Sequence, residues 1–568
     1  MYAGNRGTTV FISVRTGIKR WYDGIQKKDS RIMLILGIVL FFTSLMLLPS
    51  TILSYHYGEK IWPFIIPMII GVLLSIYMSL KYKLPNDMRP ADGLMMMFSL
   101  WIELFIFGMI PFLIYGMPFI DAFFESVSGF TTTGATIITD VQSTARGLLL
   151  WRAITNWIGG IIIVMMFMFI IPMVVSGGRG LLKNEMSGSG GGNLSIKLGN
   201  AAKQFITMYI ILTALFTLVL FVQKVTLFDS VTIAMSSISI GGFLNTNDSM
   251  SSYSIFVKIT VIVFMIVSAS NFYLHYRAMF KLDFRGYGRS DEFKIMILWF
   301  LVISLVLIVE CFTSGEWSSI EGGPGDKVVD VVFTVVSMGT TSGFYTVDYN
   351  VHWAFLEDLS LFMVLMLIGG SAGSTSGGVK ISRVIITIKA MFNEIRQEVH
   401  PNAIYSVRYD GKGVSPDVVH SAMVIVVAFL IVTGIGAVFF NRVMDLDEAV
   451  YTSVAMITNT GTATSTYFND YSTLPGWTKV ISCALMFLGR MEILAILCIF
   501  TPGFWLEFIG RAGINRTKST LSIPGRIKAL RKKRYGQEEE TPADGEELPD
   551  DEFPEDGPQE HYAEEEQD

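Results

Sequence analysis

Long apolar segments are the feature that most constrains how this chain can fold. Ten of them recur between Arg31 and Phe504. A helix needs about 20 mostly apolar residues to cross a bilayer, and these segments reach that length. Only 16% of the residues are charged, against roughly 25% in a soluble domain. The chain is therefore predicted to be an all-α integral membrane protein, not a soluble one. The predicted spans are 32–54, 62–82, 92–115, 150–174, 203–223, 255–280, 293–313, 355–392, 418–440 and 476–503.

Basic residues predict which side of the membrane each connection faces. Lys and Arg favour the cytoplasmic side. They are concentrated in the N-terminal arm, in alternate connections and after the last span, so both termini are predicted to be cytoplasmic. The segment from Glu538 to Asp568 holds 16 of the 49 acidic residues and no Lys or Arg. This composition favours a disordered tail over a docking segment.

Four outward connections share one pattern, an acidic residue followed by a short apolar stretch and a Ser/Thr/Gly cluster. Each acid precedes an aligned glycine by 12 to 14 residues, with one span before and one span after. The chain is therefore predicted to contain four helix–loop–helix repeats around a central pore. The acids are Asp121, Asp229, Asp330 and Asp447, and the aligned glycines are Gly134, Gly241, Gly343 and Gly461.

The physical chemistry of one such connection favours a cation site. About 11 apolar residues form a helix of roughly 16 Å, which enters half of the bilayer core without crossing it. The acid at its start is expected to cap free N–H groups, and the other end directs partial negative charge toward the membrane centre. Irregular backbone at that depth is tolerated where it is buried in protein or lines a watery path. One isolated copy would favour ordinary small-residue helix packing, but four matched copies favour a pore.

Glycine in these clusters lets carbonyl groups face a dehydrated ion. Side-chain oxygens two residues earlier add hard ligands suited to alkali cations. The predicted filter residues are Thr132, Thr133, Gly134, Ser239, Ile240, Gly241, Thr341, Ser342, Gly343, Asn459, Thr460 and Gly461.

Two further signals lie inside predicted spans. The sequence GGSAGSTSGG at 369–378 predicts a break, because glycine is costly in a helix and hydroxyls compete for the backbone. Close packing through small residues is the alternative. Arg490, followed by Glu492, stands in the middle of the last span, where a charge indicates function or an ion pair with another span.

No catalytic or cofactor site is predicted. The three cysteines lack CxxC spacing and there is no GxxxxGK[ST] loop, so neither redox chemistry nor ATP hydrolysis by this chain is expected. The chain is predicted not to be an enzyme and to bind no cofactor, and an alkali cation is the expected transported substrate.

These motifs together resemble the Trk/Ktr/HKT superfamily of potassium transporters, and within it the prokaryotic Trk-type membrane subunit. The resemblance covers about residues 32 to 510. It rests on DAFFESVSGFTTTGAT in the first loop, on WRAITNWIGG at 151–160, on GGSAGSTSGGVKISR at 369–383, on HPNAI at 400–404 and on FLGRMEI at 487–493. The fourth loop, TNTGTATSTY, departs from the Asn-rich form typical of that subunit.

The resemblance carries further implications. It implies a homodimer in the plasma membrane of a prokaryote, a cytosolic nucleotide-binding regulatory ring, and Arg490 facing the pore below the filter. Glycine at position 134 points to potassium. The break implies a gate made of Gly369, Gly370, Gly373, Ser374, Thr375, Gly377, Gly378 and Lys380.

The expected function is potassium uptake through a gated, selective pore. A sodium- or proton-coupled symporter, a less selective K⁺/Na⁺ channel and a non-transporting scaffold are the alternatives. The expected organisation is a cytoplasmic arm at 1–31, an extra transmembrane hairpin at 32–90, repeats at 91–200, 201–290, 291–414 and 415–510, and a cytoplasmic tail at 511–568.

Overall fold

The computed structural model describes residues 32–82, 90–166, 194–313, 322–346, 360–403, 405–463 and 471–510. The expected arm 1–31 and tail 511–568 lie outside these residues. Within them, seven helices are long and apolar enough to cross a membrane. Two more pairs of helices pass the same test jointly but are bent by 99° and 108°. The expected span 355–392 begins outside the described residues and is interrupted farther on.

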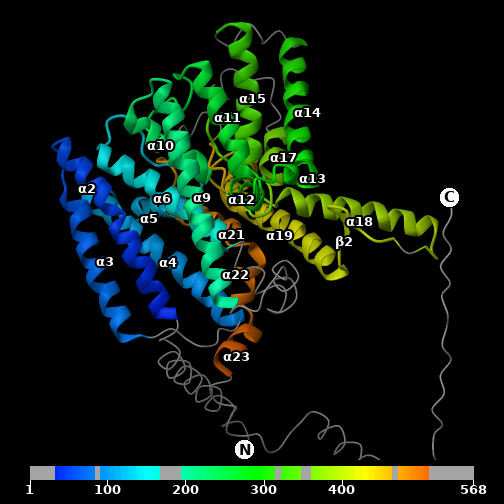
Figure 1. The fold of residues 1–568 in the computed structure, drawn as a ribbon, viewed down its shortest axis with the longest axis horizontal. Helices are drawn as coiled ribbons and strands as arrows, with labels where there is room; N and C mark the ends of the chain where they lie inside the picture. The colour runs from blue at the N-terminus through cyan, green and yellow to red at the C-terminus, as the bar shows by residue number, and fades with distance from the viewer. Residues whose placement is uncertain are drawn as a thin grey trace, which may run out of the picture. The chain divides into compact units, whose positions relative to one another are not determined.

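A helical hairpin precedes the expected repeats (Figure 1). Its first arm ends in α2 (Leu47–His56) and its second is α3 (Trp62–Lys81). The hairpin docks on α6 (Arg146–Met165). The carboxylate of Glu59 accepts hydrogen bonds from the N–H groups of Arg146 and Gly147 at 2.7 and 3.0 Å. A carboxylate at free N–H groups suits the positive end of a helix, so Glu59, in the loop of the hairpin, caps the N-terminal end of α6.

The helices that follow keep the order expected of four repeats, with a short helix between longer segments each time. The short helices are α5 (Phe119–Phe130), α10 (Leu227–Ser239), α15 (Pro324–Thr340) and α20 (Leu446–Ile457). The segments before them are α4 (Pro90–Tyr115), α9 (Leu194–Val222), α14 (Asp291–Thr313) and α19 (Pro416–Phe440). The segments after the short helices differ in form, because α6 follows α5 as one helix whereas each of the other short helices is followed by two. The two are α11 (Ile255–Ala269) and α12 (Phe272–Lys281) after α10, α17 (Ser360–Ile368) and α18 (Ile381–Val399) after α15, and α21 (Gly476–Arg490) and α22 (Ile493–Ile499) after α20.

Small elements complete the described chain. Helices α13 (Arg285–Arg289) and α23 (Pro502–Gly510) are short. Strands β1 (Arg408–Tyr409) and β2 (Lys412–Gly413) pair antiparallel, with Tyr409 opposite Lys412. The all-α expectation therefore holds for the spans, and this hairpin is a minor exception to it.

Each short helix packs against the helix that comes next after the short helix of the preceding repeat, as well as against its own neighbours. The pairs are α10 on α6, α15 on α11, α20 on α17 and α5 on α21. The last of these pairs joins the first repeat to the fourth. The four short helices therefore follow one another in a closed cycle.

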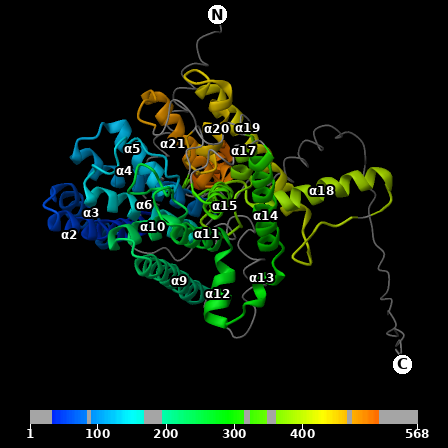
Figure 2. The same ribbon diagram turned by 90° about the horizontal axis from the view of Figure 1, so that it is seen from above.

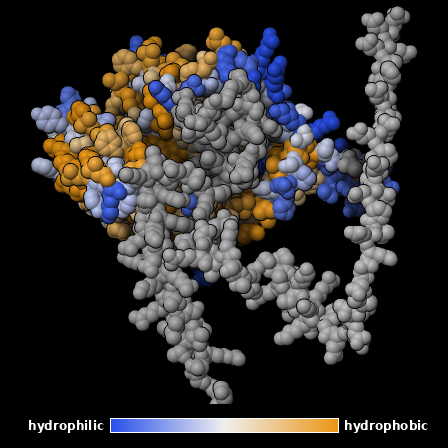
Figure 3. All heavy atoms as spheres, turned by 60° about the horizontal axis from the view of Figure 1, so that its bottom comes forward, coloured by the Kyte–Doolittle hydropathy of each residue, from blue (hydrophilic) through white to orange (hydrophobic). Residues whose placement is uncertain are grey.

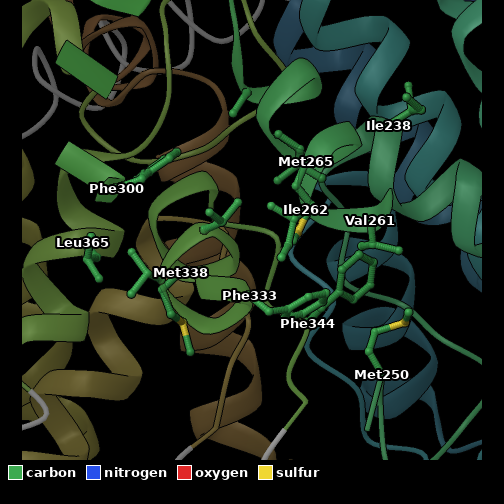
Figure 4. Packing of buried hydrophobic residues seen from close by; sticks show 14 of the residues in the cluster. Ile238, Met250, Val261, Ile262, Met265, Phe300, Phe333, Met338, Phe344 and Leu365 are labelled. Carbon is green, nitrogen blue, oxygen red and sulfur yellow. The ribbon is translucent and has the colours of Figure 1, made fainter. Parts of the chain in front are cut away.

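Apolar side chains join these helices. Phe333 and Met338 of α15 share one buried cluster with Val261, Ile262 and Met265 of α11 (Figure 4). The outer faces of the long helices are also apolar, as the broad hydrophobic areas in Figure 3 show. A lipid environment explains an apolar exterior around a packed interior.

Two expected spans, 255–280 and 476–503, are not continuous helices. The first bends by 99° between α11 and α12, and the second by 108° between α21 and α22. A bend at membrane depth frees backbone groups that need partners. At the first bend, the carbonyl of Ala269 accepts from Ser371 N at 2.8 Å and the N–H of Phe272 donates to Gly373 O at 3.1 Å. The sequence did not predict these bends. At the first of them, a loop distant in the sequence supplies partners for the freed backbone groups.

Candidate functional site

The same turn ends all four short helices. A non-glycine residue with positive φ comes first, and a glycine with positive φ follows two positions later. The N–H between them donates to the carbonyl five residues back, at 2.7 to 2.9 Å. This is a helix C-terminal motif that depends on left-handed backbone. The non-glycine residues are Thr132, Ile240, Thr341 and Asn459, and the glycines are Gly134, Gly242, Gly343 and Gly461.

The second repeat corrects the predicted alignment by one residue. Gly242, with φ of +78°, occupies the position of the other three glycines, and Gly241 takes the position of Thr133. Ser239 is the last residue of α10, and its hydroxyl bonds within that helix to Met235 O and Ser236 O. In backbone geometry, residues 240–242 therefore correspond to residues 132–134 of the first repeat, one residue later than the predicted trio of Ser239, Ile240 and Gly241.

The four turns touch one another in order. A Cβ built on Gly134 would lie 2.5 Å from the carbonyl oxygen of Gly241. The corresponding distances are 2.8 Å from Gly242 to Ser342 O, 2.1 Å from Gly343 to Thr460 O and 2.1 Å from Gly461 to Thr133 O. Each glycine thus abuts the backbone of the next repeat, and the fourth abuts the first. Only glycine fits such approaches with positive φ.

Several buried oxygens at these turns have no hydrogen-bond partner among the described residues. They are Thr132 Oγ1, Ser342 Oγ and Asn459 Oδ1. The amide nitrogen of Asn459 is occupied, since it donates to Thr133 Oγ1 at 3.0 Å and to Met486 O at 2.8 Å. An unpaired buried oxygen is costly unless a ligand satisfies it. Hydroxyl and carbonyl oxygens are suited to alkali cations.

The acids at the starts of the short helices do not act as N-caps, which corrects a second expectation. Asp121 and Asp229 are the third residues of their helices, Asp447 is the second and Asp330 the seventh. Two of them form ion pairs between repeats. Asp121 Oδ1 lies 2.7 Å from Lys479 Nζ, and Asp330 Oδ1 lies 2.8 Å from Lys258 Nζ. Lys479 and Lys258 were not predicted, although each is the fourth residue of the first helix after the glycine turn of its repeat.

The segment 369–380 interrupts the third repeat, as the sequence predicted. It leaves the helical conformation after α17, and Gly369, Gly373, Gly378 and Lys380 have positive φ. Its residues reach the ends of three short helices. Thr375 Oγ1 donates to Ile238 O at 3.0 Å, Ser376 Oγ donates to Thr340 O at 2.8 Å, and Gly377 N donates to Thr341 Oγ1 at 2.7 Å. A Cβ on Gly377 would lie 1.8 Å from Thr458 O of the fourth repeat.

Charged side chains form hydrogen bonds to this segment. Arg490, 4% exposed, donates from Nη2 to Thr375 O at 2.8 Å, and the Lys380 ammonium donates to Ser376 O. Arg383 Nη2 contacts both oxygens of Glu492 at 2.5 and 2.6 Å. Arg490 therefore contacts the segment itself, while Glu492 pairs with another span. A small cavity lies among Ser376, Gly377, Gly378, Lys380, Arg383, Phe429, Gly489, Arg490 and Glu492.

Glu292 also contacts the segment and was missed from the sequence. Its Oε1 accepts from Ala372 N at 2.6 Å. Glu292 is the second residue of α14 and is 5% exposed. Beside it, Asp291 and Asp410 each accept from the other's backbone N–H, at 2.7 and 3.3 Å. An acid in the first turn of a helix is ordinary, so its sequence position gave no signal of this contact.

Comparisons with known proteins agree with this architecture. The family described as TrkH, cation transport protein, matches residues 81–503. The Trk system potassium uptake protein TrkH of Halomonas elongata is 30% identical over 491 residues, which cover 84% of this chain and 98% of that protein. The protein of the same name from Escherichia coli strain K12 is 29% identical over 488 residues, covering 83% and 98%. The crystal structure of the potassium transporter TrkH from Vibrio parahaemolyticus matches with a TM-score of 0.74 and 27% identity, covering 84% of this chain and 99% of that chain.

Proposed function

This chain is a member of the TrkH family of cation transport proteins, and we propose that it takes up potassium through a selective pore. The family consists of transport proteins and not of enzymes. The similar proteins from Halomonas elongata and Escherichia coli are named as potassium uptake proteins. The residues that match the family, 81–503, include all four filter turns.

The observation that carries this proposal is the closed contact of the four turns. Each glycine lies against a carbonyl of the next repeat. The position of each carbonyl therefore depends on the neighbouring turn, and the four equivalent carbonyls are those of Thr133, Gly241, Ser342 and Thr460. A ring of carbonyl oxygens replaces the hydration shell of an ion. The C-terminal ends of the four short helices add partial negative charge. Both features favour a cation over an anion.

The segment 369–380 is proposed to gate this path. Its hydrogen bonds to the ends of two short helices and its close approach to Thr458 O at the end of a third support a position next to the filter. Glycines with positive φ and hydroxyl groups give it alternative backbone conformations. Arg490, which holds Thr375, would place a positive charge beside the path and so modulate the passage of cations.

Two assemblies belong to the same proposal. A regulatory nucleotide-binding ring would act from the cytoplasmic side, and a second copy of the chain would form a homodimer. Helix α18 supports the homodimer, because it extends beyond its neighbouring helices in both views (Figures 1 and 2) and is thus accessible to a second copy. It also presents an exposed apolar stripe at helical spacing. The stripe comprises Ile388, Met391, Phe392, Ile395 and Val399.

Transport by the purified full-length chain in liposomes tests the function. Rubidium uptake driven by a potassium gradient, and its competition by K⁺ over Na⁺, are the expected results. Uptake that reverses with the K⁺ gradient in the absence of any Na⁺ or H⁺ gradient supports a channel, whereas a requirement for a second gradient supports a symporter. Absence of any alkali-cation flux from correctly inserted protein would contradict the proposal. Purification from the native host in mild detergent tests both assemblies, and recovery of a monomer alone would count against them.

A further inference from the structure

A buried ion pair lies behind the filter turns of the first two repeats. Arg152 on α6 and Glu125 on α5 approach within 2.7 Å, from Nε to Oε1. Their side chains are 2% and 0% exposed. Removing two charges from water is costly unless their remaining donors and acceptors are satisfied. The other partners of the pair therefore show which groups it holds in place.

Glu125 holds the chain that leaves the first filter turn. Its Oε1 accepts from Thr136 Oγ1 at 3.0 Å, and its Oε2 accepts from Ile137 N at 3.2 Å. Arg152 Nη2 donates to the same Thr136 hydroxyl at 3.0 Å. Thr136 and Ile137 follow Gly134 by two and three residues. Both charges thus fix the exit of the first turn.

Arg152 also holds the chain that leaves the second filter turn. Its Nη1 donates to Leu244 O at 3.3 Å, and its guanidinium lies 4.0 Å from the centre of the Phe243 ring. Phe243 and Leu244 directly follow Gly242. A guanidinium over an aromatic face is attracted to it. One buried pair therefore ties together the exits of two neighbouring turns.

Of the four contacts between neighbouring turns, the one between the first and second turns has such a buried pair behind it. Glu125 stands seven residues before Thr132, the positive-φ residue of its turn. The corresponding residues are Ile233, Thr334 and Thr452, none of them ionisable. In the described part of the chain, three ion pairs join side chains of two different repeats, and none of them includes a residue that directly follows a filter glycine: Lys258–Asp330, Lys479–Asp121 and Arg383–Glu492. The four-repeat cycle is therefore reinforced unequally.

The same face of α6 contacts both turns farther along. A Cβ on Gly241 would lie 2.3 Å from Asn156 Nδ2, and a Cβ on Gly159 would lie 2.0 Å from Phe130 O. Arg152, Asn156 and Gly159 are spaced so as to share one helix face. The sequence WRAITNWIGG thus forms a continuous support behind the first and second turns.

We propose that Arg152, paired with Glu125, is a specificity-determining positioning residue that sets the spacing between the carbonyls of the first and second filter turns. The inference rests on the proposed potassium pore. By fixing Thr136 and Leu244, the pair keeps Gly134 against the carbonyl of Gly241. Ion selectivity depends on the number and placement of the oxygen ligands. Loosening this junction lowers the preference for K⁺ over Na⁺ without blocking the path.

The test compares two double variants of the full-length chain in liposomes. Glu125→Gln with Arg152→Met removes the charges together, so that neither remains buried alone. Lys258→Met with Asp330→Asn removes an inter-repeat pair away from the turns and serves as the matched control. We expect the K⁺/Na⁺ permeability ratio of the first variant to fall by about fivefold, the factor that one lost hydrogen bond represents. The control keeps the wild-type ratio even if its thermal stability falls equally.

Thr136→Val keeps both charges and removes the hydroxyl that both of them contact, so it tests the inference if the double variant does not fold. Its ratio is expected between those of wild type and the double variant. A wild-type ratio in the folded double variant overturns the inference, and so does an equal fall in the control. If the double variant does not fold, a wild-type ratio in folded Thr136→Val overturns it. Wild-type protein that passes K⁺ and Na⁺ alike overturns the proposed function itself, and this inference with it.

Discussion

Replacing Gly134 by serine tests the filter geometry most directly. A Cβ at this position would lie 2.5 Å from Gly241 O and 2.7 Å from Gly242 Cα. Both are backbone atoms, which cannot rotate away as the end of a side chain can. In a close-packed interior the gap must widen by roughly 0.5 Å to reach the 3.0 Å lower limit of real Cβ contacts. The serine therefore displaces the carbonyl of the second turn more than its own.

The magnitude follows from two separate costs. A φ of +77° costs a residue with a Cβ about 1–2 kcal/mol, which lowers stability without acting on selectivity. Moving one of four carbonyl ligands forfeits about 1 kcal/mol of ion contact, which corresponds to roughly fivefold. Because K⁺ matches the original ring, it should lose more than Na⁺. We expect the K⁺/Na⁺ permeability ratio to fall by about fivefold.

The structure also predicts at which of the four glycines a serine lowers the K⁺/Na⁺ permeability ratio most. The contacts at Gly343 and Gly461 are tighter, at 2.1 Å, and the contact at Gly242 is looser, at 2.8 Å. Serine at 343 or 461 should thus lower the ratio more than serine at 134, and serine at 242 should lower it less. Gly58 is the matched control, since it has a φ of +69° and no atom within 4 Å of a built Cβ.

The assay is the K⁺/Na⁺ permeability ratio of each of the five variants, measured in liposomes of the same composition. Gly58→Ser should leave the ratio unchanged, because it carries the backbone strain without the displaced carbonyl. An unchanged ratio with normal flux in Gly134→Ser would show that this turn does not line the ion path. A ratio that falls equally in Gly58→Ser would show that global destabilisation, and not filter geometry, causes the effect.

Three further predictions concern the segment 369–380. Deleting Ser371–Ser376 should raise K⁺ flux and weaken any dependence on a regulatory partner, whereas lower flux in normally inserted protein would make the segment a structural support. Glu292→Gln weakens the bond from Ala372 N–H, worth about 1 kcal/mol, and should raise basal flux severalfold in rubidium uptake, while Glu310→Gln on the same helix should not. Arg490→Gln removes the buried positive charge that contacts Thr375 O and should raise cation conductance, and single-channel currents equal to wild type would place Arg490 off the path.

Local sequence determined the elements of this protein. The length of the apolar segments predicted where most spans lie, because a bilayer of fixed thickness demands that length. Recurring Ser/Thr/Gly clusters predicted four turns, and five glycines in residues 369–378 predicted the interruption, because glycine weakens any helix. Each of these inferences depends on neighbours in the chain, so it could be made without a tertiary structure.

The register of the second turn required the structure. The glycines were aligned by their sequence context, whereas hydrogen bonds at the helix end set the turn. A constant spacing was available in the sequence, since Gly134, Gly242 and Gly343 each follow their acid by 13 residues. Glu448 likewise precedes Gly461 by 13. The presence of two adjacent glycines, 241 and 242, concealed this regularity.

Contacts between repeats were decided only by the tertiary structure. Lys479 pairs with Asp121 across 358 positions of the chain, and Arg152 reaches Leu244 across 92. The bend after Ala269 likewise occurs where a segment of another repeat satisfies the freed backbone groups, and Arg490 at the second bend donates to Thr375 O of the third repeat. No local pattern specifies such partners, because they meet only when the four repeats close into a cycle. Hydrophobic length thus fixed the spans, and closure of the cycle fixed which charges and carbonyls face one another.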